Sequence, residues 1–154
     1  MPVDVLCAAT IARPREVVAA FVANPDNAPA WHVNIRSVEW KTAPPLRVGS
    51  RIAFVARFLG AHLTYIYEVT EFVPGKRLVM RTTADPFPME TIYTWTPAAA
   101  GTTRMILRHR GGPSGLARLL TPAIGAAMRY ANRKDLARLK KLLEQQVPAG
   151  GASS

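Results

Sequence analysis

The chain has 154 residues, of which 49% are hydrophobic and 19% are charged, so it is long enough to bury a core of its own and does not have a disordered composition. Cys7 is the single cysteine, which excludes an intrachain disulfide framework and a cysteine-based zinc or iron–sulfur site. The net charge of +10 comes from 15 Arg and 5 Lys against 10 acidic residues, and its spread along the chain favours a solvated basic surface over a dedicated nucleic-acid site.

The first thirty residues predict a strand followed by two short helical segments. Apolar residues alternate with the others from Val3 to Ile11, which is typical of a strand with one buried face. Pro14 suits the first turn of a helix, and Asn24-Pro25 ends that helix before a second short turn. The stretch MPVDVLCAATIARP lacks the features of a signal peptide, and no stretch approaches the roughly 20 apolar residues of a membrane span. We therefore expect a cytoplasmic protein.

From residue 34 to 110, apolar residues recur at every second position, which is the period of a strand. Six strand-like segments cover about residues 35–41, 51–58, 63–69, 78–82, 89–95 and 103–110. Turn-forming sequences such as Pro74-Gly75-Lys76 separate them, which predicts an antiparallel meander. Together with the first strand, these segments predict a seven-stranded sheet.

After residue 113 the period returns to that of a helix. Ser114 can cap a short segment, and Thr121-Pro122 predicts the start of a main helix of about 25 residues, roughly 37 Å long. Only this helix is long enough to cover the apolar face of the sheet, so the sheet must curve around it. The sequence therefore predicts one α+β domain over residues 1–146 and a flexible tail over residues 147–154.

Small side chains predict a gap between the helix and the sheet. Ala123, Gly125, Ala127 and Ala131 are expected to face the strands, whose inward residues are large. An empty space costs about 24 cal/mol per cubic ångström, so a cavity retained at that cost suggests a ligand.

Several stretches carry a resemblance to a known family. They are IARPREVVAAFVANPDNAPAW, PLRVGSRI, YEVTEFVPGKRLVMR, GTTRMILRHRG and LARLKKLLEQ. Together they resemble the START-like, or SRPBCC, superfamily, which includes polyketide cyclases and the Bet v 1 allergens, over about residues 3–146. The resemblance implies a helix-grip fold with an apolar cavity between the sheet and the last helix. One departure is Asn24, where many relatives carry Asp.

The residues expected to line this cavity share the inward face of the strands or of the helix. They combine aromatic bulk with a few hydroxyls and one imidazole, which suits a ligand with rings and oxygens, although core packing is the alternative for each of them. The expected ligand-binding residues are Trp31, Phe54, Phe58, Tyr65, Tyr67, Met80, Met89, Thr91, Tyr93, Trp95, Leu107, His109, Ala127, Met128 and Ala131.

Two of these residues are candidates for catalysis. His109 shares a strand face with Met105 and Leu107, so its imidazole would act as an acid or base, or would anchor a ligand oxygen. The alternative is a partly exposed histidine bonded to backbone or water. Tyr93 is the second candidate. His62 is expected in solvent, and His32 either near the cavity entrance or on a loop surface.

No other reactive arrangement is legible in the sequence. The carboxylates, Asp135 among them, are expected mostly on solvated faces, and no pair has the spacing of an acid and a base. Three dispersed histidines without a spaced carboxylate do not make a metal site. We therefore expect no metal and no cofactor, and the missing carboxylate pair favours binding over catalysis.

Three functional hypotheses follow. The first is binding of a small hydrophobic molecule that is lipid-like, aromatic or polyketide-like. The second is a polyketide cyclase/dehydratase-like enzyme that uses the same cavity. The third is an interaction module in which the basic face of the last helix meets an acidic protein, RNA or membrane, with a merely solvated face as the alternative; that face holds Arg129, Arg133, Lys140 and Lys141. The sequence does not distinguish a monomer from a homodimer.

Overall fold

The computed structural model describes residues 3–58, 60–82, 88–111, 119 and 121–152, with the backbone alone for Phe58 and for residues 146–152. The short segment predicted at Ser114 lies outside these residues. The described elements are β1 (Val3–Ile11), α1 (Arg15–Ala23), the 3-10 helix η1 (Pro25–Asn27), α2 (Ala28–Trp31), β2 (Ile35–Trp40), β3 (Arg51–Phe58), β4 (Ala61–Val73), β5 (Arg77–Thr82), β6 (Met89–Pro97), β7 (Thr103–Gly111) and α3 (Thr121–Ala152).

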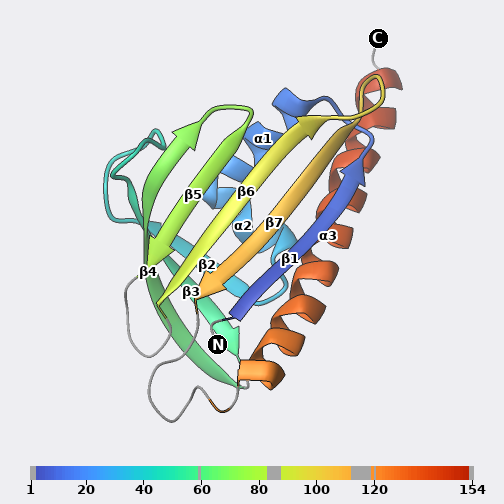
Figure 1. Ribbon diagram of the computed structural model, residues 1–154. Coiled ribbons are helices and arrows are strands. Elements are labelled where there is room, and N and C mark those ends of the chain that lie inside the picture. The colour runs from blue at the N-terminus through green and yellow to red at the C-terminus, as the bar shows by residue number, and fades with distance from the viewer. Residues whose placement is uncertain (1–2, 59, 83–87, 112–118, 120, 153–154) are drawn as a thin grey trace.

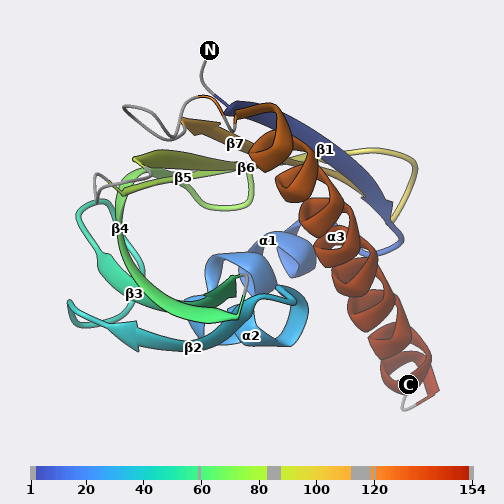
Figure 2. The same cartoon turned by 90° about the horizontal axis from the view of Figure 1, so that it is seen from below.

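The seven strands form one antiparallel sheet in the order β1-β7-β6-β5-β4-β3-β2. Each strand from β2 to β6 pairs with the next along the chain, as the predicted meander requires. The first strand pairs with the last, with Val3 opposite Gly111 and Ile11 opposite Thr103. Figures 1 and 2 show the sheet curled around α1 and α2, with α3 lying along β1. The predicted α+β architecture, a curved seven-stranded sheet with a long C-terminal helix, is confirmed.

Alternation along the strands decides which side chains face the hollow of the sheet. In β1, Val3 and Val5 are buried while Asp4 between them is exposed. In β7, the same alternation buries Met105 and Leu107. The core therefore lies on the concave side, between the sheet and the helices.

Gly111 ends β7 in a conformation that other residues avoid. Its φ is +135°, and an added Cβ would lie 2.3 Å from the carbonyl oxygen of Pro88. The close approach of these two backbone segments fixes the point where β7 leaves the sheet beside the start of β6.

The second half of α3 closes the sheet at β1. Leu136, Leu139 and Leu143 are buried in the core. Side chains of α3 also reach the backbone at the end of β1: Lys140 Nζ donates to Thr10 O at 2.6 Å, and the amide of Ala12, one residue past the strand, donates to Glu144 Oε2 at 2.8 Å. These bonds occupy polar groups at one end of an edge strand, which would otherwise be free to pair with another chain.

The helix α3 has 32 residues and continues to Ala152, past the predicted end of the domain at residue 146. The mobility of residues 147–154 stays a prediction. Within the described part of the chain, no helix is long and apolar enough to cross a membrane.

The prediction that the alanines of this helix face the sheet is wrong for Ala123 and Ala127, which are exposed. The inward stripe runs instead through Ile124, Met128, Asn132, Asp135, Leu139 and Leu143. Asn132 and Asp135 are polar but belong to this inward stripe. A search that accepts only small or apolar residues therefore assigns the alanines to the inward face instead.

Candidate functional site

The concave face is not closed equally at its two ends. Beside the second half of α3, the inward residues are fully buried, as Ile11, Leu139 and Leu143 show. Beside the first half of α3, inward residues of β4, β7 and α3 remain partly exposed; they are Leu63, Tyr65, Tyr67, His109, Ile124, Met128 and Ala131. This end lies where β7 finishes and α3 begins (Figure 1). Partly exposed side chains on an inward face indicate that the packing is open there.

A buried carboxylate joins α3 to the segment that follows α2. Asp135 is 5% exposed, and its Oδ2 accepts from Nδ1 of His32 at 2.8 Å. The other oxygen, Oδ1, accepts from the amide of Val33 at 2.9 Å. Because the carboxylate accepts from Nδ1 of His32, this bond fixes the orientation of the imidazole ring.

One turn before Asp135, Asn132 of α3 forms a hydrogen bond with a second histidine, His109 of β7. Asn132 Nδ2 donates to Nδ1 of His109 at 2.9 Å, so the imidazole of His109 is neutral and carries its proton on Nε2. Desolvation, with a smaller contribution from His32 and against an opposite effect of Asp135, lowers the pKa of His109 from 6.5 to about 4. At neutral pH His109 is therefore a hydrogen-bond donor and a weak base.

Two tyrosines of the concave face have raised pKa values. Desolvation raises the pKa of Tyr67 to about 12, although a hydrogen bond with Thr91 partly offsets it. Desolvation also raises the pKa of Tyr93 well above its usual value, with smaller effects of Tyr67 and Asp135 in the same direction. Both phenols thus stay protonated and can donate or accept hydrogen bonds without becoming charged.

Aromatic rings surround the polar groups. Tyr93 lies between two tryptophans, with ring centroids 6.2 Å from Trp31 and 6.2 Å from Trp95. Phe54 packs edge-on against Tyr67 at 5.7 Å. The Nε1 atom of Trp95 is buried and has no hydrogen-bond partner among the described residues.

A small interior cavity of about 10 Å³ lies between α2 and the strands. Its walls include Trp31, His32, Phe54, Met80 and Tyr93. This volume is room for about one water molecule, so a larger ligand needs the open end at the first half of α3.

The residues predicted for the site divide by exposure. Eight are buried, namely Trp31, Phe54, Met80, Met89, Thr91, Tyr93, Trp95 and Leu107. Five are partly buried, namely Tyr65, Tyr67, His109, Met128 and Ala131. Ala127 is exposed, and the side chain of Phe58 lies outside the described part of the chain.

Sequence reasoning misses two members of the polar cluster, Asp135 and Asn132. The expectation that Asp135 lies on a solvated face is wrong, because its carboxylate is buried and bonded to His32. For His32 the sequence leaves both the cavity entrance and a loop surface open, and it does not single out Asn132. Asn132 and Asp135 lie on the helical stripe of Met128 and Leu139, which is the signal that could have found them. No group of three metal-binding side chains occurs among the described residues.

Comparison with known proteins gives both a family and a fold. Residues 4–144 match the family described as polyketide cyclase / dehydrase and lipid transport. Among solved structures, the chain is similar to the Zhui aromatase/cyclase from Streptomyces sp. R1128, with 16% identity and a TM-score of 0.83 over 98% of this chain and 99% of that one. It is similar to the protein TTHA0849 from Thermus thermophilus, with 18% identity and a TM-score of 0.77 over 90% and 94%. It is also similar to a START superfamily protein from Mycobacterium smegmatis, with 16% identity and a TM-score of 0.71 over 95% of this chain and 97% of that one. No curated protein matches the sequence.

Proposed function

The chain belongs to the polyketide cyclase / dehydrase and lipid transport family, and we propose that it binds a small, largely apolar molecule with at least one oxygen between the sheet and the first half of α3. The START-like resemblance expected from the sequence is confirmed by this membership. Members of the superfamily bind hydrophobic ligands or act as aromatase/cyclases.

One observation carries the proposal. Inward side chains at this end are partly exposed although most are apolar or aromatic, and they adjoin the neutral hydrogen-bonded pair of His109 and Asn132. A ligand that covered Tyr65, Tyr67 and Met128 would bury apolar surface at about 25 cal/mol per Å². A ligand oxygen would accept from Nε2 of His109 or from the hydroxyl of Tyr67, which neutral groups can provide without a buried charge.

Native mass spectrometry of freshly purified protein, followed by a thermal-shift panel of fatty acids, aromatic polyketides and sterols, tests binding. We expect either a bound molecule that adds mass to the purified protein, or a class of compound that raises its melting temperature. Ala131→Phe should fill the space and abolish the shift, whereas Ala126→Phe on the exposed face of the same helix should leave it unchanged. A panel in which no compound binds the wild type, or in which the two variants behave alike, would contradict the proposal.

A second candidate function is supported by the His32–Asp135 pair. A carboxylate that holds Nδ1 of an imidazole leaves Nε2 oriented as a base. In a cyclase-like reaction, His32 would take a proton from a carbon next to a carbonyl, and the resulting enolate would attack a second carbonyl of the same polyketide. His109 and Tyr93 would donate hydrogen bonds to the oxygen that becomes negative.

This candidate is tested by turnover of a poly-β-ketone substrate. His32→Gln should lower kcat by at least about 100-fold, which is typical of removing a general base. His109→Gln and Tyr93→Phe should each lower it less, because they remove one hydrogen bond. Turnover that is unchanged in His32→Gln would remove this residue from the mechanism and leave binding as the function.

A further inference from the structure

The outward face of α3 carries a dense positive charge. Opposite the buried stripe, six exposed cations share one arc of the helix: Arg129, Arg133, Lys134, Arg138, Lys140 and Lys141. The acidic residues of the described helix do not neutralise this arc as a whole. Asp135 points inward to His32, and Glu144 lies 2.7 Å from Lys140 alone.

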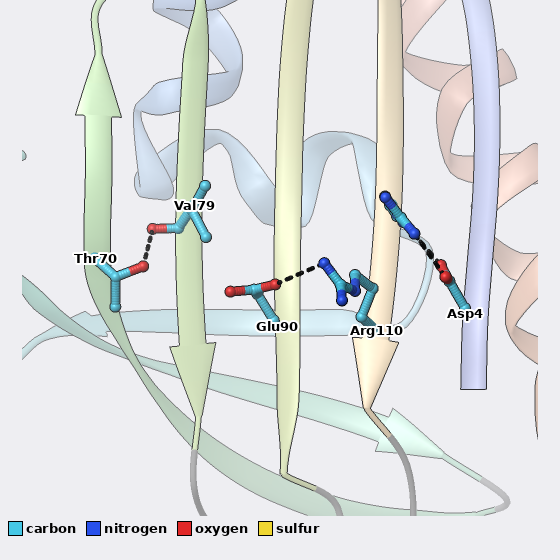
Figure 3. A network of polar contacts seen from close by, with 6 residues as sticks. Asp4, Thr70, Val79, Glu90 and Arg110 are labelled. Atoms are coloured by element: carbon cyan, nitrogen blue, oxygen red, sulfur yellow. Dashed lines mark hydrogen bonds and ion pairs between the residues drawn. The ribbon is translucent and has the colours of Figure 1, made fainter. Parts of the chain in front are cut away.

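Three arginines on the sheet have acidic partners. On the face of the sheet turned away from the helices, these three are paired with acids on neighbouring strands, as Figure 3 shows for Glu90 with Arg110 and at Asp4. These pairs are Arg108–Asp4 at 2.6 Å, Arg110–Glu90 at 3.8 Å and Arg77–Glu71 at 3.0 Å. Within the part of the chain that the structure describes, four cations of α3 make no ion pair: Arg129, Arg133, Arg138 and Lys141. Their charge is therefore available to an external partner.

Large apolar side chains are exposed beside these cations. Tyr130, in the middle of the arc, is 64% exposed, and the Lys134 ammonium lies 5.0 Å from its ring centroid. Leu119, just before the helix, is 80% exposed, and Leu6 on β1 is 53% exposed. Tyr130 lies next to Lys134, and Leu6 lines a groove with Arg133 and Lys140, so apolar and positive surface adjoin at both places.

A groove of about 610 Å³ lies between β1 and α3 on the same side of the molecule. Apolar side chains of both elements line it, including Leu6 and Leu136, together with Arg133 and Lys140. It thus offers apolar surface next to two positive charges, which is the complement of a lipid with an anionic head group.

We propose that this surface, formed by the outward residues of α3 with Leu6 and Leu119, docks on an anionic phospholipid bilayer. The cations lie over the head groups, while Tyr130 and the leucines enter the interfacial layer. An RNA would match the charge but would leave the exposed leucines without contacts. This inference rests on the outer face of α3 and is independent of the ligand proposed for its inner face.

Flotation of the full chain with phosphatidylcholine vesicles, with and without phosphatidylglycerol, tests the proposal. We expect binding only to the anionic vesicles, weakening between about 0.1 and 1 M NaCl as the Debye length falls from about 10 to about 3 Å. The double variant Arg133→Gln and Arg138→Gln should bind about 25-fold more weakly, since each cation near such a surface contributes about fivefold. Tyr130→Ala should lose the binding that remains at high salt.

The matched control is Arg81→Gln with Arg104→Gln, which removes the same charge from exposed positions on the sheet. It should bind within about threefold of the wild type, and circular dichroism should show that all variants are folded. Equal loss in both double variants would show that net charge alone acts, which overturns the proposal. So would the absence of binding to anionic vesicles at low salt, or binding to single-stranded RNA and not to vesicles with the same dependence on α3.

Discussion

His32 and Asp135, 103 positions apart in the sequence, are joined at 2.8 Å between Nδ1 and Oδ2. The contact connects α3 to the segment after α2, and both side chains are largely buried, with 11% and 7% of their surface exposed. One carboxylate therefore holds the short helices against the long one and also orients an imidazole toward the interior.

Replacing Asp135 should destabilise the fold strongly. Asp135→Ala leaves both His32 and the Val33 amide without their acceptor, and hydrogen bonds to a charged group are worth about 1.5–3 kcal/mol each, so we expect a loss of about 3 kcal/mol in urea unfolding. Glu39→Ala is the control, because its pair with Lys41 is exposed and should contribute less than about 1 kcal/mol. Similar losses in the two variants would show that the buried pair is not a structural link.

Stability should fall in mild acid through His109. Its pKa is 6.5 in an unfolded chain and about 4 in the fold, so only the unfolded state takes up this proton between these values. Protonation therefore favours unfolding as the pH falls from about 6.5 to about 4, by about 3 kcal/mol in total at about 1.4 kcal/mol per pKa unit. Urea unfolding across this range should show the slope in the wild type and in His62→Gln, an exposed control, but much less of it in His109→Gln.

Two glycines should respond to alanine in opposite directions. Gly111→Ala should cost more than about 2 kcal/mol, because φ is +135° and the new Cβ would meet Pro88 O at 2.3 Å. Gly125→Ala lies in α3 with no atom within 4 Å of the new Cβ, so it should stabilise by about 0.5–1 kcal/mol. Thermal unfolding distinguishes these outcomes, and destabilisation by Gly125→Ala would place that position against a neighbour.

The orientation of α3 can be tested by a further pair of substitutions. Leu139→Ala removes a fully buried side chain and should cost about 2–5 kcal/mol. Ala126→Gln changes an exposed position and should alter the free energy of unfolding by less than about 0.5 kcal/mol. A large effect at Ala126 would mean that the helix is rotated relative to the stripe described above.

The fold is largely predictable because its signals are local and periodic. Alternation from Val3 to Ile11 and in the six later strands, followed by a long helical period, determines a curved sheet with one covering helix. The alternation also places His109 beside Leu107 on the concave face, where it contacts Asn132 of α3.

The polar cluster is less predictable because its members make long-range contacts. Asn132 and Asp135 are buried only because His109 and His32 arrive from distant elements to satisfy them. A polar residue on a helix is normally expected to face solvent, and the sequence near Asp135 does not indicate that His32 is its hydrogen-bond partner. The prediction that Ala123 and Ala127 face the sheet is wrong for the same reason, because the inward stripe of α3 contains the polar residues Asn132 and Asp135.

The pairing of β1 with β7 has a consequence for synthesis of the chain. The residues that lie opposite Val3 and Ile11 are Gly111 and Thr103, so the first strand has no neighbour in the sheet until about two thirds of the polypeptide has been made. The strands from β2 to β7 pair with neighbours that are adjacent in sequence, whereas β1 cannot pair before β7 has been made. Closure of the sheet at β1 therefore depends on a long-range contact, of the kind that slows folding.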